Sequence, residues 1–339
     1  MKICLYSDVH WSTYSSILRK RGDNYSIRLE GLIQSLTWVE QVAKDCDCQQ
    51  IYCLGDFFDQ PMLSAEEISA IKEVKWADLP HFFIVGNHEM GRNDLFFNST
   101  DMFGLSNNFH VIKDITKMSL NDRPLTMIPY MLNYDTTISD IVDCDKNGII
   151  LMHNDIKGIQ MGPVTSKCGF DIDDISKNCA FCVNGHLHNG EQIADNIINI
   201  GNLTGQNFSE DAVRYEHHAM IIDTDTLEYK FIKNPFAFNF YKFDLCNKTV
   251  AEMKHVLSSI DNNAIITLKC NEVYKDKIND LLPNDKIIEK KIIFERTLTV
   301  TVNHAELLQV DHLKQFHDYI ISSEGRDEIV SYELSEVLR

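Results

Sequence analysis

The sequence predicts an α/β protein in which two stacked mixed β-sheets are flanked by helices. Two observations lead to this fold class. Short apolar runs, each ended by a polar turn, recur throughout the first 234 residues. In the second half of that stretch they follow one another with few helical segments between them. Strands in such succession favour two packed sheets over one open, doubly wound sheet, in which a helix follows nearly every strand.

The elements follow in order from residue 2, where the first strand begins. Apolar residues at helical spacing predict a helix over 25–44, and Ser64 with Glu67 forms a capping box that opens a second helix over 64–76. The remaining apolar runs predict strands: KICLYS, QQIYCLG, HFFIVG, LTMIPY, GIILMH, CAFCVNG, NIINIG, HAMIIDT and YKFIKN.

The composition changes near Asn234-Pro235. Beyond it, the runs FNFYKFDL, AIITLKC and EKKIIFERTLTV alternate with helical patterns over 250–259 and up to about 282. This order predicts a small α+β capping domain over 235–303 that follows a first domain over 1–234. Residues 304–339 read as two helices whose apolar stripe either docks on a partner or packs on the cap.

Composition limits the possible classes of protein. The chain has 339 residues, of which 44% are apolar, and a net charge of −18. This acidity disfavours a stand-alone nucleic-acid binder, because contacts to phosphates come from Lys and Arg, although bound metals or a partner subunit could supply positive charge. The ten cysteines show no disulfide framework, and we find neither a signal peptide nor an apolar run of ~20 residues. We therefore expect a cytoplasmic protein without a membrane span, in the host cytoplasm if a phage encodes it.

Five polar motifs each follow a predicted strand. A strand that ends in a ligand directs that side chain to the edge of the sheet, where α/β proteins place their sites. Carboxylates mixed with imidazoles suit Mn²⁺, Fe²⁺, Mg²⁺ or Zn²⁺. The absence of Cys ligands from these motifs argues against a structural zinc. Each motif is a weak signal alone, but the five in order predict a di-metal site. They are Asp8-Val9-His10, Gly55-Asp56-Phe57-Phe58-Asp59, Gly86-Asn87-His88-Glu89, His153-Asn154 and Gly185-His186-Leu187-His188.

Two metal ions ~3.5–4 Å apart need a bridging ligand, and the Asp56 carboxylate is the natural bridge. We expect Asp8, His10 and His188 to complete the shell of one ion, and Asn87, His153 and His186 that of the other. His88 is not needed as a ligand and could stabilise the transition state or protonate the leaving oxygen. We expect Asp59 to brace a metal-binding histidine and Glu89 to orient His88.

The set D-x-H, G-D-x-x-D, G-N-H-E, H and G-H-x-H resembles that of the calcineurin-like metallophosphoesterases. Within them the chain looks most like SbcD-type nuclease subunits, and it is similar to double-strand-break repair nucleases and phage recombination endonuclease subunits. The resemblance implies metal ligands at the seven positions just named, catalytic support from His88, and two divalent ions, Mn²⁺ first with Mg²⁺ as an alternative. Residues 200–210 resemble the segment that follows the last histidine pair in SbcD-type proteins.

Two features depart from related patterns. Glu89 stands where SbcD-type nucleases mostly carry Asp. Protein phosphatases share G-N-H-E but follow G-D-x-x-D with Arg-Gly, whereas Gln60-Pro61 stands here, which counts against that kind of phosphomonoesterase. The basic cluster Arg19, Lys20 and Arg21 could contact a DNA backbone or could be a solvated loop.

Three functional hypotheses follow. The leading one is a DNA exo- and endonuclease that acts in recombination, repair or end processing with an SbcC-like ATPase. The resemblance implies that residues 304–339 dock on this ATPase and that a homodimer forms through 13–36 or 90–105. The second hypothesis is a phosphodiesterase or phosphatase for small nucleotides. The third is an interaction protein with a degenerate metal site.

Overall fold

The structure, a computed structural model, describes residues 1–13, 18, 20–105, 107–132, 145–161, 164–210 and 212–295. The expected docking helices at 304–339 and the end of the cap, 296–303, lie outside these residues. The domain boundaries at 234 and 303 therefore stay predictions.

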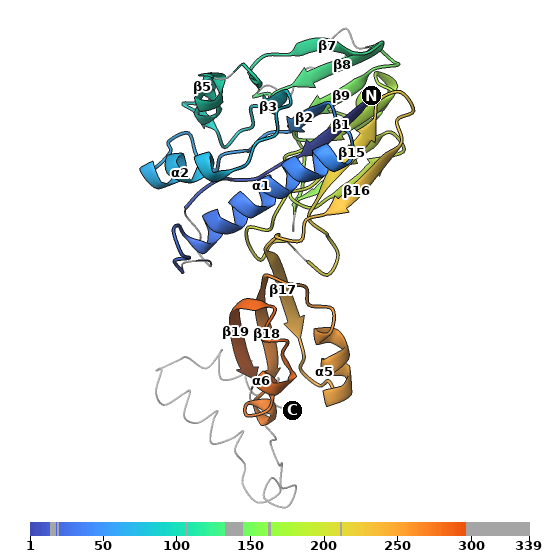
Figure 1. Ribbon diagram of the computed structural model, residues 1–339. Helices are drawn as coiled ribbons and strands as arrows, with labels where there is room; N and C mark the ends of the chain where they lie inside the picture. The colour runs from blue at the N-terminus through green and yellow to red at the C-terminus, as the bar shows by residue number, and fades with distance from the viewer. Residues whose placement is uncertain are drawn as a thin grey trace, which may run out of the picture. The chain divides into compact units, whose positions relative to one another are not determined.

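Two six-stranded mixed sheets, built from strands within residues 2–233, form the larger part of the chain, which confirms the predicted fold class (Figure 1). In the first sheet β1, β2, β3 and β6 are parallel, while β15 and β16 run antiparallel at one edge. The order is β16 (Tyr229–Lys233), β15 (His218–Asp223), β1 (Lys2–Tyr6), β2 (Gln50–Cys53), β3 (His81–Ile84) and β6 (Phe109–Ile112).

In the second sheet β14, β12, β9 and β8 are parallel, and an antiparallel strand closes each edge. The order is β13 (Glu191–Ala194), β14 (Ile197–Asn199), β12 (Phe181–Asn184), β9 (Ile149–Met152), β8 (Arg123–Ile128) and β7 (Thr116–Leu120). Short ribbons lie between the main strands: β4 (Met90–Gly91) with β5 (Asp94–Asn98), and β10 (Gln160–Met161) with β11 (Val164–Thr165).

The two sheets pack through a shared apolar core. Alternate residues of β1 and β2, such as Leu5 and Tyr52, meet Leu151 of β9 and Val183 of β12, and all four are fully buried. Successive side chains of a strand point to opposite faces, so each sheet has a second apolar face to cover. Helix α1 (Ile27–Asp45) and a cluster of aromatic rings cover the first sheet, and α4 (Ile172–Lys177) packs on the second.

The cap of the second predicted helix matches its sequence signal. Ser26 caps α1, and Ser64 with Glu67 forms the expected capping box of α2 (Ala65–Ala70). The second helix is shorter than predicted, because a 3₁₀ turn (Ile71–Glu73) follows it and the chain becomes extended at Val74. The extended backbone lets Trp76 turn back into the aromatic cluster, where its ring stands edge-on to that of Phe83. A second 3₁₀ turn (Ser99–Leu105) leads to β6.

A small domain with its own apolar core follows the second sheet. Its three strands are parallel and adjacent in chain order: β17 (Asn239–Asp244), β18 (Ala264–Asn271) and β19 (Ile287–Glu295). Helix α5 (Val250–Leu257) joins the first two strands, while a 3₁₀ turn (Glu272–Tyr274) and α6 (Ile278–Leu281) join the next two. This is the strand–helix–strand–helix–strand order expected from the sequence. Within the described ranges no helix combines the length and the hydropathy needed to cross a membrane.

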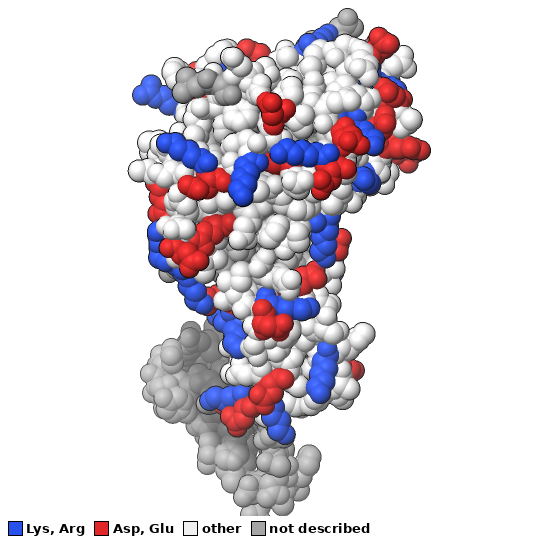
Figure 2. Space-filling view, in the orientation of Figure 1, with Lys and Arg blue, Asp and Glu red and all other residues white. Residues whose placement is uncertain are grey.

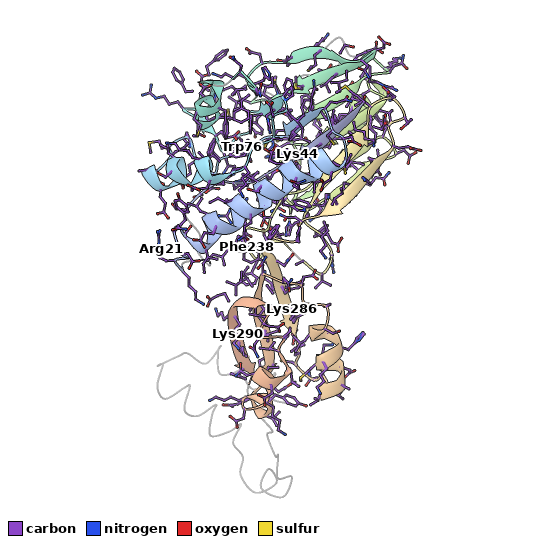
Figure 3. All side chains as sticks on the ribbon, in the orientation of Figure 1. Arg21, Lys44, Trp76, Phe238, Lys286 and Lys290 are labelled. Carbon is purple, nitrogen blue, oxygen red and sulfur yellow. The ribbon has the colours of Figure 1, made fainter. Side chains whose placement is uncertain are left out.

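Phe238, just before β17, lies between α1 and the small domain (Figure 3). A Cβ atom added at Gly31 of α1 would stand 2.4 Å from the Phe238 ring, so only glycine lets the ring pack this closely on the helix. The small domain therefore packs on the part of the chain that holds the two large sheets through a direct contact between a ring and a helix backbone.

Leu151→Ala should destabilise the protein by about 2–5 kcal/mol, because it leaves a cavity between the two sheets where the side chain is fully buried. Urea unfolding followed by circular dichroism would measure this. Leu132 is 55% exposed and provides the matched control, because Leu132→Ala should change stability by no more than ~0.5 kcal/mol. Equal effects of the two substitutions would contradict the packing described above.

Candidate metal centre

The five motifs occupy the loops that follow β1, β2, β3, β9 and β12. Because these strands are parallel to their neighbours within each sheet, their carboxyl ends lie at a common edge. Backbone hydrogen bonds join the loops directly, from Asp8 N to Gly55 O (3.1 Å) and from His10 N to Asp56 O (2.9 Å). These two bonds join the loop after β1 to the loop after β2.

Four of the predicted ligands adopt the left-handed backbone conformation, which is uncommon outside glycine. The φ angles are 52° at Asp8, 46° at His10, 49° at Asp56 and 75° at His186. Gly55, with φ of 100°, shows why the turns are tight, because a Cβ atom there would stand 2.2 Å from Nδ1 of His153. Concentrated backbone strain of this kind is typical of functional sites.

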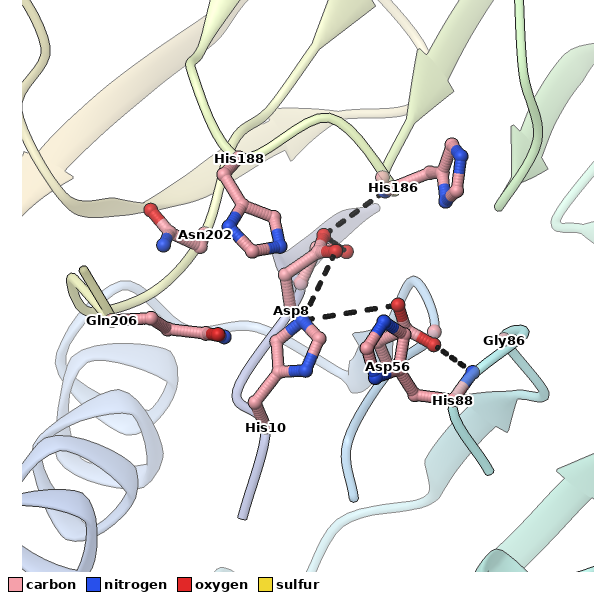
Figure 4. Close-up of polar contacts among 12 residues, drawn as sticks. Asp8, His10, Asp56, Gly86, His88, His186, His188, Asn202 and Gln206 are labelled. Atoms are coloured by element: carbon pink, nitrogen blue, oxygen red, sulfur yellow. Dashed lines mark hydrogen bonds and ion pairs between the residues drawn. The ribbon is translucent and has the colours of Figure 1, made fainter. Parts of the chain in front are cut away.

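Asp8, His10 and His188 form the first cluster of ligands, with one ligand atom from each lying within 4.8 Å of the others (Figure 4). Nε2 of His10 is 3.8 Å from Oδ1 of Asp8 and 3.8 Å from Oδ2 of Asp56. Both Nε2 of His10 and Oδ1 of Asp8 are buried, and neither has a hydrogen-bond partner in the described part of the chain. Buried polar atoms left without partners are costly, and a cation held between them would satisfy both.

Asp56, His153 and His186 form the second cluster. Nε2 of His153 lies 3.1 Å from Oδ2 of Asp56 and 3.3 Å from Oδ1 of Asn87, while Nδ1 of His186 is 3.3 Å from the same nitrogen. Oδ2 of Asp56 thus faces His10 of the first cluster as well as His153 of the second. The structure therefore brings all seven predicted ligands together, with Asp56 between the two clusters, and the donor set fits two divalent ions.

Each imidazole uses its second nitrogen to contact an acceptor behind it. Oδ1 of Asp59 lies 3.0 Å from Nδ1 of His10, and the carbonyl oxygen of Leu54 lies 2.6 Å from Nδ1 of His153. Such contacts fix the ring and leave the other nitrogen free for a metal. Asp59 thus makes the bracing contact that the sequence led us to expect.

Two further bracing carboxylates were missed by the sequence reasoning. Oδ1 of Asp155 lies 3.0 Å from Nε2 of His186, and Oε1 of Glu210 lies 3.0 Å from Nδ1 of His188. Asp155 directly follows the His153-Asn154 motif, and Glu210 ends the segment that the resemblance marked. The positions of both residues were visible in the sequence. Their pairing with His186 and His188 was not, because each partner is more than 20 residues away along the chain.

Glu89 does not orient His88, so the expectation for this residue is wrong. Its buried carboxylate instead accepts hydrogen bonds from the backbone N–H groups of Phe57 (2.5 Å), Phe58 (3.1 Å) and Gly86 (2.6 Å), and so ties two motif loops together. Burial, with the nearby Asp56 charge, raises the pKa of Glu89 to about 7, although the N–H donors partly oppose this. The carboxylate is a structural clamp.

His88 takes its orientation from Asp59. Its Nδ1 lies 3.2 Å from the Asp59 carbonyl oxygen, its backbone N–H donates to Oδ1 of Asp56 (2.9 Å), and its ring centroid is 4.6 Å from that of His10. The side chain is 43% exposed, whereas those of the neighbouring ligands His10 and His153 are almost completely buried. His88 therefore stands where an incoming substrate would meet the site.

The charges of the cluster are strongly coupled. Burial lowers the pKa of His10, but the hydrogen bond with Asp59 and the nearby carboxylates of Asp8 and Asp56 outweigh this and raise the pKa to about 10. Burial likewise lowers the pKa of His153, whereas the Asp56 charge raises it to about 9. For Asp56, burial raises the pKa, but His153 and His10 more than compensate and hold it far below its usual range. Without metal at pH 7, Asp56 is therefore ionised and these two imidazoles are protonated.

Arg28 of α1 lies beneath the centre and was not predicted. Its guanidinium is buried and donates to the carbonyl oxygen of His10 (3.0 Å). Burial lowers the pKa of Arg28, while the charges of Asp59 and Glu210 oppose that shift. A positive charge thus stands near two of the bracing carboxylates, which reduces the cost of burying them.

The basic cluster expected to contact DNA lies partly outside the described residues, because Arg19 is not among them. Nζ of Lys20 is 2.9 Å from Oε2 of Glu289 in β19, and Arg21 pairs with Glu66. Both side chains are more than 60% exposed. Their use as DNA contacts stays a prediction.

Residues 1–211 match the family described as calcineurin-like phosphoesterase, and the chain belongs to that family. It is accordingly a metal-binding hydrolase that acts on phosphoester bonds. No curated protein matches the chain.

Solved structures similar to the chain include three from different organisms. A dimetal phosphatase from Danio rerio has a TM-score of 0.40 and 12% identity, covering 69% of this chain and 99% of its own. The protein TT1561 of Thermus thermophilus has a TM-score of 0.41 and 8% identity, covering 68% and 98%. Yfce, a phosphoesterase from E. coli, has a TM-score of 0.32 and 10% identity, covering 69% and 100%.

Metal affinity should increase with pH. Because the raised pKa values of His10 and His153 keep both rings protonated at pH 7 in the metal-free protein, each must lose its proton before it can bind an ion. For an ion that displaces one proton, affinity should rise about tenfold per pH unit between pH 6 and 8. Isothermal titration of Mn²⁺ in two buffers with different ionisation enthalpies would measure the released protons. A constant affinity without proton release would contradict these charge states.

Proposed function

We propose that the protein is a DNA nuclease of the SbcD type, which hydrolyses phosphodiester bonds with two divalent ions, Mn²⁺ in the first place. The observation that carries the proposal is the small domain of β17, β18 and β19, which follows the phosphoesterase part and contacts it close to the metal centre. Phe238 packs on α1, and Lys20 of the loop before α1 pairs with Glu289 of β19. A compact enzyme for a small substrate needs no such domain, whereas a nuclease needs further surface along its polymer.

Residues of the chain supply positioning and proton transfer at the site. The bound ions would act as Lewis acids that neutralise charge on the phosphoryl group. His88 presents its ring at the exposed side of the two clusters, with Nδ1 held by the Asp59 carbonyl oxygen. When the ring is protonated, Nε2 can donate its proton to the leaving oxygen of the cleaved ester. Asp59 would thus orient the ring of His10 through its carboxylate and the ring of His88, the proton donor, through its carbonyl oxygen.

The residues after the second motif favour a diester over a monoester. Gln60 and Pro61 stand where related phosphomonoesterases carry Arg-Gly, so no guanidinium is supplied from that position. A phosphomonoester carries up to two negative charges, and a bidentate arginine is well suited to hold them. A phosphodiester carries only one negative charge, so a bidentate arginine is less important for binding it.

Basic side chains follow one another from Arg21 toward β19, where Lys20 approaches the strand and Lys290 lies (Figures 2 and 3). Lysines and arginines in such a row could contact successive phosphates of a DNA strand. The net charge of −18 limits the affinity for DNA that this row of basic side chains can provide alone. We therefore extend the proposal to an SbcC-like ATPase partner that docks on residues 304–339 and shares the DNA contact.

A homodimer is also part of the proposal. Of the two candidate stretches, 90–105 includes β5, where Phe96 and Phe97 are 60% and 63% exposed. Neighbouring apolar side chains with this exposure are typical of a contact surface.

The second candidate function is a phosphodiesterase or phosphatase for small nucleotides, and the strong net negative charge is the observation that favours it. A scaffold with a degenerate site is disfavoured, because every expected ligand position holds a competent donor.

Hydrolysis assays with Mn²⁺ would separate these functions. We expect cleavage of a linear duplex and a single-stranded oligonucleotide, and little turnover of a phosphomonoester or a cyclic nucleotide. Asp56→Asn is the control, because it removes the bridging charge while Asn tolerates the left-handed backbone at this position. Turnover of the small esters with DNA left intact would replace the nuclease by the second function. If every substrate is inert, the assay is repeated with the ATPase partner, and continued inactivity would refute the nuclease.

His88→Ala should reduce DNA cleavage by about 10²–10⁴-fold, because it removes a group that transfers a proton. The same substitution should leave Mn²⁺ affinity nearly unchanged, since the seven ligands remain. Cleavage kinetics and a metal titration on one preparation would test both statements. Metal loss in proportion to lost activity would make His88 a ligand.

A further inference from the structure

Glu210 connects the first ligand cluster to the segment that follows the second sheet. Its Oε1 lies 3.0 Å from Nδ1 of His188 and accepts a hydrogen bond from the side-chain amide of Asn202 (3.0 Å). Its Oε2 accepts one from the backbone N–H of Gln206 (2.9 Å). The carboxylate is almost completely buried, so its position is set by these partners and not by solvent.

The same segment is held on its other side by the small domain. The N–H of Gly205 donates to the carbonyl oxygen of Phe238 (3.1 Å), and the N–H of Phe238 donates to Oγ1 of Thr204 (2.9 Å). Beyond Glu210, the N–H of Ala212 donates to the carbonyl oxygen of Phe240 in β17 (3.1 Å). Backbone contacts with Phe238 and β17 therefore flank Glu210 on both sides along the chain.

Aromatic packing reinforces these hydrogen bonds. The ring of Phe208, two residues before Glu210, stands edge-to-face on the buried ring of Phe240, with centroids 5.2 Å apart. Phe238 packs in turn on α1 at Gly31. The segment thus lies between β17 and the metal centre, and little in it can move without moving one of the two.

The second cluster has a different support. His186 is braced by Asp155, which follows β9 in the second sheet, and His153 is braced by the carbonyl oxygen of Leu54, which follows β2. Both braces come from the phosphoesterase part. The two ion sites therefore differ in what holds them.

We propose that Glu210 and Phe240 are positioning residues, through which the small domain sets the geometry of the ion site formed by Asp8, His10 and His188. The site of His153 and His186 is independent of that domain. A force on β17, from a bound polymer or a partner, would then change the affinity for one ion and spare the other. This inference concerns metal binding and does not depend on which ester is cleaved.

Two phenylalanines of β17 provide a matched pair for the test. Phe240 is 1% exposed and contacts Phe208, whereas Phe243 is 8% exposed and lies in the core of the small domain, stacked on Tyr241 at 5.5 Å. The experiment is a Mn²⁺ titration of the full chain by calorimetry and electron paramagnetic resonance, which resolves two sites. Phe240→Ala should weaken one site by about tenfold or more and leave the other unchanged. Phe243→Ala should leave both unchanged.

Substitutions of the braces identify the affected site. Glu210→Gln should weaken the same site as Phe240→Ala, and Asp155→Asn should weaken the other. Because Phe240 acts through Glu210, the double variant should bind no more weakly than Glu210→Gln alone. Phe240→Leu, which keeps most of the apolar volume, replaces Phe240→Ala if the latter does not fold.

Two results would overturn the inference. If Phe240→Ala and Phe240→Leu leave both affinities intact while Glu210→Gln weakens one, the phosphoesterase part alone holds the brace. If Phe243→Ala weakens binding as much as Phe240→Ala, the effect is general loss of stability and not positioning.

Discussion

The packing of two sheets against each other is the constraint on which the rest of the molecule depends. Parallel pairing brings the ends of β1, β2 and β3 together in one sheet and those of β9 and β12 in the other. The shared core, in which Leu5 and Leu151 are fully buried, then fixes the two edges side by side. Ligands separated by as many as 180 residues, such as Asp8 and His188, meet because of this packing and not because of any local preference.

The metal centre buries many charged groups in one place, and contacts between these groups stabilise them. Each metal-binding imidazole has an acceptor behind it, Glu210 accepts further hydrogen bonds, and Arg28 places a positive charge near Asp59 and Glu210. Buried charges are tolerated only when they are paired in this way. Removing one member would leave its direct partner unpaired.

Features encoded by a local pattern along the chain could be predicted from the sequence. Contacts between residues far apart along the chain could not. Strand ends carry their ligands within the same short motif, so Asp56 and His153 could be assigned from their neighbours along the chain. Glu89 was misread because its partners, the N–H groups of Phe57 and Phe58, belong to another loop. Asp155 and Glu210 were missed for the same reason. The early end of α2 depends on where Trp76 packs, which its helical spacing could not reveal.

The left-handed backbone at Asp8, His10, Asp56 and His186 has an evolutionary consequence. Aspartate, asparagine, histidine and glycine enter this conformation more readily than other residues, and β-branched residues are strongly disfavoured there. The residues able to replace a ligand are therefore restricted twice, by metal chemistry and by backbone sterics. A related protein that lost its catalytic activity would still be restricted to these few residue types at the four positions. Ligand-like residues could then outlast the activity that first required them.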